Sequence, residues 1–256
     1  MARTHVASTW RHTAGYLYLL RLDGPALAWE YLRRNPQYQE AYRLRRQRWR
    51  REQAGPEHLG LMEWEDPGRD AREAFPLWKP ELSPVLYISP ASDAGGRPCP
   101  GLDLWSMSGR KRLRLLDRAD GYLALVVQCG SRWLRARIEP MALAAPSCIF
   151  WFPVPASARP ALLQAQILPS LPGILPDNRR RPRAYRNETL HLRALQALDG
   201  VAAGATQREI AQVIFGQEYV QEGWHADSSL RRQIRHYLSR GNFFMREGYL
   251  GLLTLR

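Results

Sequence analysis

Three strand-like segments lie between residues 112 and 138, and the first and third alternate arginine with apolar residues. This pattern constrains the fold more than any other feature of the sequence. Residues 112–116, 122–128 and 132–138 are separated by Asp120-Gly121 and Gly130-Ser131, which are typical of tight turns. Because successive side chains of a strand point to opposite faces, the pattern predicts an antiparallel β-meander with one apolar and one basic face. The basic face would carry Arg112, Arg114, Arg135 and Arg137. We expect this face to be solvated, with nucleic-acid contact as the alternative.

Helical patterns lie on both sides of this sheet region. Residues 14–22, 25–34 and 37–53 have apolar positions at helical spacing, and further helices are predicted within residues 188–239. The fold class that follows is α+β, with N-terminal helices, a central antiparallel β-meander and a C-terminal winged helix-turn-helix. An arginine- and proline-rich stretch at residues 177–183 predicts a linker near residue 180.

The expected domains follow from this linker and from the change in composition after residue 56. Residues 1–56 form a helical N-terminal segment, residues 57–178 form an antiparallel sheet region packed with those helices, and residues 180–256 form a DNA-binding domain. A chain of 256 residues is long enough for such a division.

The chain is strongly basic, with a formal net charge of +13. Of its 37 lysines and arginines only Lys79 and Lys111 are lysines, and the excess lies in residues 1–56 and 110–256, whereas residues 57–109 are acidic on balance. Such a field attracts polyanions, so nucleic acid is the first partner to consider and an anionic membrane the second. The arginines considered as additional phosphate contacts are Arg43, Arg45, Arg46, Arg50, Arg179, Arg180 and Arg181.

The most specific pattern lies in the last seventy-five residues. Thr206 and Glu209 have the spacing of a capping box, which predicts a helix beginning after Thr206, and a further helix is expected over residues 230–239. Leu230, Ile234 and Leu238 would bury one side of this helix while arginines occupy the other, an arrangement that fits the major groove of duplex DNA. The residues expected to contact DNA are Ser228, Ser229, Arg231, Arg232, Arg235, His236, Ser239 and Arg240, with Gln207, Arg208 and Arg246.

Residues 241–245 and 249–255 read as two strands joined across residues 246–248. A hairpin directly after a recognition helix predicts a winged helix-turn-helix, with Arg246 in the wing. The simpler interpretation is a three-helix bundle with a solvated arginine face.

Catalytic and metal-binding patterns are absent from the sequence. The three cysteines, Cys99, Cys129 and Cys148, lack CxxC spacing and are expected to be free thiols, and the six histidines form no HxH or HxxxH pair. The acidic residues 63–66 are better explained as a loop or interface than as a metal site. We therefore expect no enzyme activity, no metal and no cofactor. The sequence has no long apolar run, so we expect a soluble, cytoplasmic protein that does not contact a membrane.

A family resemblance appears at both ends of the chain. Residues 16–38, which include the stretch AWEYLRRNP, resemble the transcriptional-regulator-like segment of proteobacterial activators of the FseA and RovC type. Residues 195–216 and 229–249, with QREIA, FG and SLRR, resemble the second domain of these proteins. The resemblance implies a DNA-binding transcriptional activator that forms homo-oligomers.

Two further partners and one alternative function remain open at this point. Shorter relatives that resemble only the second domain can act as antiactivators through protein contact. The alternative is therefore a non-catalytic interaction factor whose basic surface binds a protein. RNA polymerase or an antiactivator protein are the further partners that the resemblance leaves open.

Overall fold

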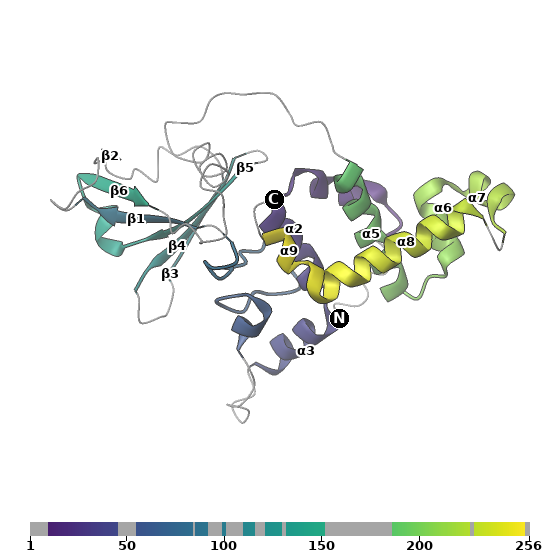
Figure 1. Cartoon of the computed structure of the whole chain (residues 1–256), viewed down its shortest axis with the longest axis horizontal. Coiled ribbons are helices and arrows are strands. Elements are labelled where there is room, and N and C mark those ends of the chain that lie inside the picture. Colours follow the sequence, from purple (N-terminus) through teal and green to yellow (C-terminus); the bar gives the residue numbers. More distant parts are fainter. Residues whose placement is uncertain are drawn as a thin grey trace. The chain divides into compact units, whose positions relative to one another are not determined.

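The computed structural model describes residues 10–45, 55–83, 85–91, 99–100, 110–115, 121–129, 132–151, 186–225 and 228–253. The chain forms two compact units (Figure 1). The helical unit comprises residues 1–53, 66–74 and 181–252, and the sheet unit comprises residues 54–65, 75–180 and 253–256. Each unit is therefore assembled from segments that are far apart in the sequence.

The N-terminal helices of the helical unit begin where the sequence offers a capping residue. A 3-10 helix, η1, spans Thr13–Arg21, and α2 (Gly24–Leu32) and α3 (Pro36–Leu44) follow. The side chain of Asp23 accepts a hydrogen bond from the Ala26 amide at 3.0 Å, and that of Asn35 accepts one from the Gln37 amide at 2.8 Å. A proline occupies the first turn of both α-helices, where its missing N–H costs nothing. The helices expected in this segment are confirmed as far as residue 45.

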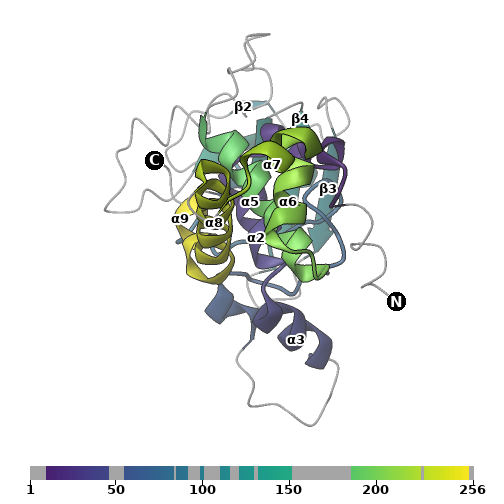
Figure 2. The ribbon, with the colours of Figure 1, turned by 90° about the vertical axis from the view of Figure 1, so that its right-hand side faces the viewer.

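The C-terminal part of the helical unit contains α5 (Arg186–Ala202), α6 (Gln207–Phe215), α7 (Gln217–Gly223), α8 (Ser229–Phe243), the π-helical turn η5 (Phe244–Gly248) and α9 (Leu250–Leu253). Figure 2 shows α5, α6 and α8 side by side. Their shared core contains Ile210 and Ala211 of α6, and Ile234 and Tyr237 of α8. Helix α7 lies between the two helices that the sequence predicted here, in a stretch for which no helix was expected. Gly216 has a positive φ of 100°, which ends α6 and lets a new helix bury Val220.

The sheet unit is built on six strands in the order β2-β6-β1-β5-β4-β3. Their bounds are Leu86–Pro90 (β1), Cys99–Pro100 (β2), Arg110–Leu115 (β3), Leu123–Cys129 (β4), Arg132–Ile138 (β5) and Ser147–Trp151 (β6). Two short 3-10 helices, η2 (Pro56–Leu59) and η3 (Pro140–Leu143), complete the described elements of this unit. The expected meander is confirmed, since β3, β4 and β5 pair in antiparallel order. The sheet as a whole is mixed, because β1 pairs with β5 in parallel.

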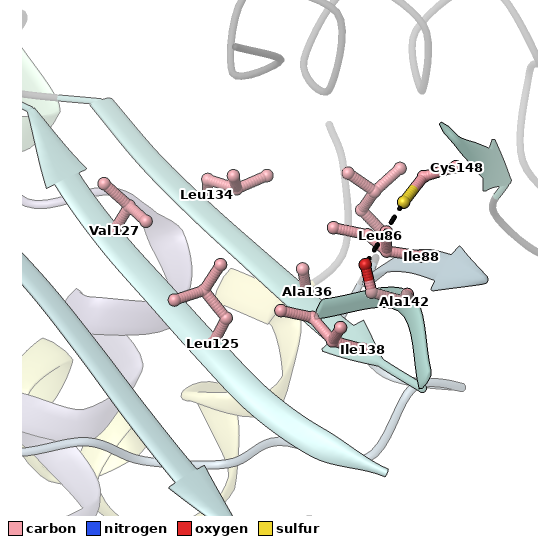
Figure 3. Close-up of a cluster of buried hydrophobic side chains, with 9 residues drawn as sticks. All are labelled: Leu86, Ile88, Leu125, Val127, Leu134, Ala136, Ile138, Ala142 and Cys148. Atoms are coloured by element: carbon pink, nitrogen blue, oxygen red, sulfur yellow. Dashed lines mark hydrogen bonds between the residues drawn. The ribbon is translucent and has the colours of Figure 1, made fainter. Parts of the chain in front are cut away.

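One face of the sheet holds a closed apolar core (Figure 3). Its members come from four strands and from η3: Leu86, Ile88, Leu125, Val127, Leu134, Ala136, Ile138, Ala142 and Cys148. The register places Leu86 opposite Ala136 and Ile88 opposite Ile138, so that alternate residues of each strand reach the same face. Cys148 is a buried free thiol, as expected, and its sulfur lies 3.4 Å from the Ala142 carbonyl oxygen.

The opposite face is not the solvated arginine row that we expected. Met62 and Phe75 pack on Ala124 and Val126, so the central part of this face is also buried. Arg137 is only 8% exposed, and its guanidinium lies between two rings, 5.0 Å from the Tyr122 centroid and 5.7 Å from the Tyr87 centroid. The alternation of arginine with apolar residues in the strands does not indicate which segment covers the sheet. Met62 and Phe75 belong to a turn-rich region of the sequence outside these strands. The side chains of Arg112 and Arg114 lie outside the described part of the structure.

The grouping of domains also differs from the expected one. We expected residues 1–56 to pack with the sheet region and residues 180–256 to stand alone. Instead, η1, α2 and α3 form one unit with α5–α9. The physical reason is a set of buried polar and aromatic contacts between the two ends of the chain, described below.

Candidate nucleic-acid interface

Ser228, which the sequence suggested as a DNA contact, directly precedes helix α8. Its side-chain oxygen accepts a hydrogen bond from the Arg231 amide at 3.3 Å, and the residue is only 3% exposed. Ser228 is therefore the N-cap of the helix, and its burial removes it from the candidate interface. The expectation that Ser228 contacts DNA was therefore wrong. Serine is among the favoured N-cap residues, so the sequence was already compatible with the role that the structure shows.

The two faces of α8 follow from its apolar spacing. Leu230, Ile234 and Tyr237 are buried in the core that α8 shares with α6. At about 100° per residue, Arg232, Arg235 and Ser239 lie on the opposite side, and all three are exposed. The predicted division of this helix into a buried and a basic face is thus present in the structure.

The flanks of this exposed face carry further expected contacts. Ser229, Arg231, His236 and Arg240 are all exposed. Arg240 is held in place, because its guanidinium lies 4.8 Å from the ring centroid of Phe244 and 5.7 Å from that of Phe243. Among the residues that the structure describes, no carboxylate pairs with Arg231, Arg232 or Arg235. These three cations are available to an external anion.

The start of α6 carries Gln207 and Arg208, which were also expected to contact DNA. Thr206 and Glu209 form the predicted capping box, with the Glu209 amide donating to the Thr206 hydroxyl at 3.2 Å and the Thr206 amide donating to the Glu209 carboxylate at 2.7 Å. This box leaves Gln207 and Arg208 exposed in the first helical turn. The predicted helix start is confirmed, and both side chains lie at the surface.

The predicted wing does not exist in residues 241–253. Helix α8 continues to Phe243, the chain then makes the π-helical turn η5, and α9 follows. Gly241, which we expected to begin a strand, lies where α8 crosses α5, and a Cβ there would come within 2.9 Å of Leu198 and 3.2 Å of the Ala194 carbonyl oxygen. This glycine permits close helix packing within a continuous helix. Arg246 is exposed, but it belongs to η5.

The arginines proposed as additional phosphate contacts have diverse surroundings. Arg43 forms an exposed ion pair with Glu40, with 2.7 Å between nitrogen and oxygen. Arg45 places its guanidinium over the Tyr42 ring and donates a hydrogen bond to the Tyr42 carbonyl oxygen. The other five, Arg46, Arg50, Arg179, Arg180 and Arg181, lie outside the described residues.

A buried ionic network connects the N-terminal helices to α5. Arg34 at the end of α2 donates to both carboxylate oxygens of Asp199 on α5, at 2.7 and 2.8 Å, and to the Glu30 carboxylate at 2.6 Å. Arg33 donates to Glu30 at 2.8 Å, and the Tyr16 hydroxyl donates to Asp199 at 2.7 Å. The two arginines thus pair with two buried carboxylates, so the charges are balanced within the network.

The pKa values of the network reflect this pairing. Burial raises the pKa of Glu30, but the charges of Arg33 and Arg34 outweigh it and leave the pKa at about 2. The Arg34 guanidinium is desolvated, yet Asp199 holds its pKa well above the usual value. Burial and the neighbouring Asp199 carboxylate raise the pKa of Tyr16. Glu30, Arg34 and Tyr16 therefore each keep one protonation state near neutral pH.

An aromatic contact extends the same connection toward the end of α8. The Tyr31 hydroxyl lies 2.8 Å from Nδ1 of His191 on α5, and both rings pack against Phe244, with centroids at 5.1 and 4.8 Å. Burial lowers the pKa of His191 to about 4, helped by the charge of Arg240. Asn35 also donates to the Met245 carbonyl oxygen at 3.0 Å. Residues of the AWEYLRRNP stretch thus support α5 and the end of α8.

The acidic residues 63–66 have structural partners. Glu65 is buried and accepts a hydrogen bond from the Phe75 amide at 3.0 Å, while Asp66 accepts one from the Gly68 amide at 2.9 Å. In the part of the chain that the structure describes, no three histidine, cysteine, aspartate or glutamate side chains are placed to hold a metal ion. No described helix is long and apolar enough to cross a membrane.

Sequence comparison identifies known domains at the two ends of the chain. Residues 161–254 match the family model described as a T6SS transcription factor DNA-binding domain, and residues 9–64 match that of a proteobacterial transcriptional regulator-like domain. A search of curated proteins finds no match. The two matches confirm the resemblance to bacterial regulators of the FseA and RovC type. They support a DNA-binding transcriptional regulator, a class of protein that is generally not enzymatic.

Proposed function

We propose that the protein is a sequence-specific transcriptional regulator that reads duplex DNA with the exposed face of α8. The observation that carries this proposal is a set of three exposed arginines, Arg231, Arg232 and Arg235, which pair with no carboxylate among the described residues and lie on a helix whose other face is fixed in the core. A guanidinium offers two parallel N–H donors to the O6 and N7 atoms of guanine, so Arg232 and Arg235 have the chemistry for base readout.

The remaining exposed residues have the chemistry of backbone contacts. Ser229, Arg231, His236 and Arg240 flank the central face, and Gln207 and Arg208 lie at the start of α6. If about six phosphates are neutralised, the logarithm of the binding constant falls against the logarithm of salt concentration with a slope of about −5. Such contacts position the helix without specifying sequence.

The direct test compares arginine variants of the full-length protein. Arg232→Ala and Arg235→Ala each lose about 1–3 kcal/mol of binding to a selected duplex, because a bidentate base contact disappears. Arg21→Ala is the matched control, since Arg21 is an exposed arginine of the same unit on η1. Fluorescence anisotropy gives the affinities, and thermal unfolding verifies that all variants remain folded.

The outcome separates DNA readout from the alternative function. Unchanged affinity in both α8 variants, or an equal loss in Arg21→Ala, would remove α8 from the DNA interface. A protein that binds no duplex at all, but retains a protein partner through the same arginines, would instead be an interaction factor of the antiactivator kind.

Activation and homo-oligomer formation complete the proposed function. Both come from the resemblance to FseA- and RovC-type activators, and a several-subunit assembly would raise the affinity of a modest single interface through avidity. Sedimentation of the full-length protein above its monomer mass of 29.5 kDa tests the assembly. A reporter assay with the cognate promoter tests activation, and RNA polymerase is the partner that activation would require.

A further inference from the structure

The C-terminal end of α8 exposes two side chains that the readout by arginine does not use. Asn242 is exposed, and its amide makes no hydrogen bond to any residue that the structure describes. Phe243 is 52% exposed although it is a large apolar residue. We expected a strand here, so neither residue was among the expected DNA contacts.

Both side chains continue the face that carries the arginines. At about 100° per residue, Asn242 lies almost in line with Arg235, seven residues earlier, and Phe243 almost in line with Arg232, eleven residues earlier. The rise from Arg235 to Asn242 is about 10 Å, which corresponds to about three base pairs where the helix follows the groove. The helix thus presents arginine in one half of this face and an amide with a phenyl ring in the other.

The ring of Phe243 is held by its neighbours. The guanidinium of Arg240 lies 5.7 Å from its centroid, and the Phe244 ring packs against it edge to face at 5.4 Å. A Cβ at Gly248 would come within 2.4 Å of the Phe243 ring, so the glycine leaves the space that the ring occupies. The exposed phenyl surface therefore has a defined position on the helix.

The two groups match the two halves of one kind of base pair. An asparagine amide pairs with the N6 and N7 atoms of adenine in the major groove, and an apolar side chain contacts the C5-methyl group of thymine. Neither group competes with the arginines for guanine. On the basis of the function proposed above, we propose that Asn242 and Phe243 read A·T base pairs about three base pairs from the guanine contacts of α8.

The test begins with duplexes that the full-length protein selects from a randomised library. We expect guanine at the positions that Arg232 and Arg235 read and A·T pairs beside them. Asn242→Ala should lose about 5- to 150-fold in preference for adenine at one position while preferences at the guanine positions persist. Gln233→Ala is the matched control, because Gln233 is an exposed amide of α8 outside this face.

Replacing thymine by deoxyuridine tests the phenyl contact without changing the protein. Loss of one methyl contact should weaken wild-type binding about fourfold at the contacted position, and Phe243→Ala should abolish that difference. Phe243→Leu, which retains an apolar contact, should keep it. Thermal unfolding of each variant shows whether it is folded.

Two results would overturn the A·T proposal. In the first, Asn242→Ala keeps every base preference of the wild type; in the second, thymine and deoxyuridine bind wild type equally at all positions. Either result, together with the expected losses in Arg232→Ala and Arg235→Ala, leaves the proposed function intact. Failure of the arginine variants to alter binding removes the proposed function as well.

Discussion

Arg34 and Arg235 lie in the same unit and have the same side chain, yet their surroundings differ completely. Arg34 is almost buried, and its guanidinium contacts two carboxylates, those of Glu30 and Asp199. Arg235 is exposed and has no carboxylate partner among the described residues. Net charge alone therefore says little about function. What distinguishes the two arginines is that the fold supplies buried carboxylates to Arg34, whereas Arg235 remains accessible to an external anion.

The largest expected effect concerns the connection between the two ends of the chain. A fragment that begins at residue 180 lacks Arg34, Tyr31 and Trp10, the partners of Asp199, His191 and Gln196. Buried polar groups left without partners cost about 1–3 kcal/mol each, so three such losses, about 3–9 kcal/mol together, are comparable with the whole stability of a small domain. We expect this fragment to be unfolded or molten in circular dichroism and amide exchange. Cooperative unfolding of the fragment alone would show that the ends are independent domains.

Within the full-length protein, Arg34→Ala isolates the ionic part of this connection. It leaves two buried carboxylates short of a cation, and we expect a loss of about 3–5 kcal/mol in the free energy of unfolding. Chemical denaturation provides the measurement. Arg235→Ala is the matched comparison and should stay within about 0.5 kcal/mol of wild type, as is usual for exposed positions. A similar loss in both variants would contradict the distinction between the two arginines.

The same network predicts how stability depends on pH. The pKa of Glu30 is about 2 in the folded protein and 4.5 ordinarily, so its contribution is present above pH 4.5 and is lost as the pH falls toward 2. The pKa of His191 is about 4 against 6.5 ordinarily, so stability also falls between pH 6.5 and 4, where only the unfolded chain takes up the proton. Each group accounts for about 3 kcal/mol at most.

Two variants test which residue causes the loss of stability in each pH range. Glu30→Gln should flatten the unfolding free energy between pH 4.5 and 2, and His191→Gln should flatten it between pH 6.5 and 4. Denaturant titrations across this range give the profiles. Persistence of the upper slope in His191→Gln would mean that another group titrates there.

Local signals in the sequence were sufficient for much of the fold. The capping box of Thr206 and Glu209 and the alternation over residues 112–138 each depend on neighbouring residues, and both predictions are confirmed. The two faces of α8 were likewise predictable from periodicity. Ser228 was misassigned although its spacing fits an N-cap, because burial depends on packing that the sequence does not display.

Some errors arose at glycines, because glycine occurs both in turns and where two parts of the fold pack closely. Gly241 was expected to begin a strand and Gly248 to lie in a turn, whereas they provide room for Leu198 and for the Phe243 ring. These close contacts are made by a side chain of another helix or by an aromatic ring, so the residues next to each glycine in the sequence do not indicate them. The pairing of Arg34 with Asp199 joins residues 165 positions apart, and no local pattern indicates it. Asn242 was missed for the same reason, since its face exists only if the helix continues through Gly241.

The smallest expected effect concerns Arg43, whose surroundings are intermediate between those of the buried Arg34 and those of the exposed Arg235. It is exposed like Arg235, but it pairs with Glu40 at 2.7 Å, and that hydrogen bond, with the Glu40 charge, raises its pKa. An exposed pair contributes little to folding, so Arg43→Ala should unfold at the wild-type temperature. Because Glu40 already neutralises the guanidinium, we expect the salt dependence of DNA binding to stay unchanged as well. A phosphate contact by Arg43 would instead reduce the slope of log affinity against log salt by about 1. Glu40→Gln sharpens the comparison: by freeing Arg43 from its partner, it should strengthen binding at low salt only if this arginine reaches the duplex.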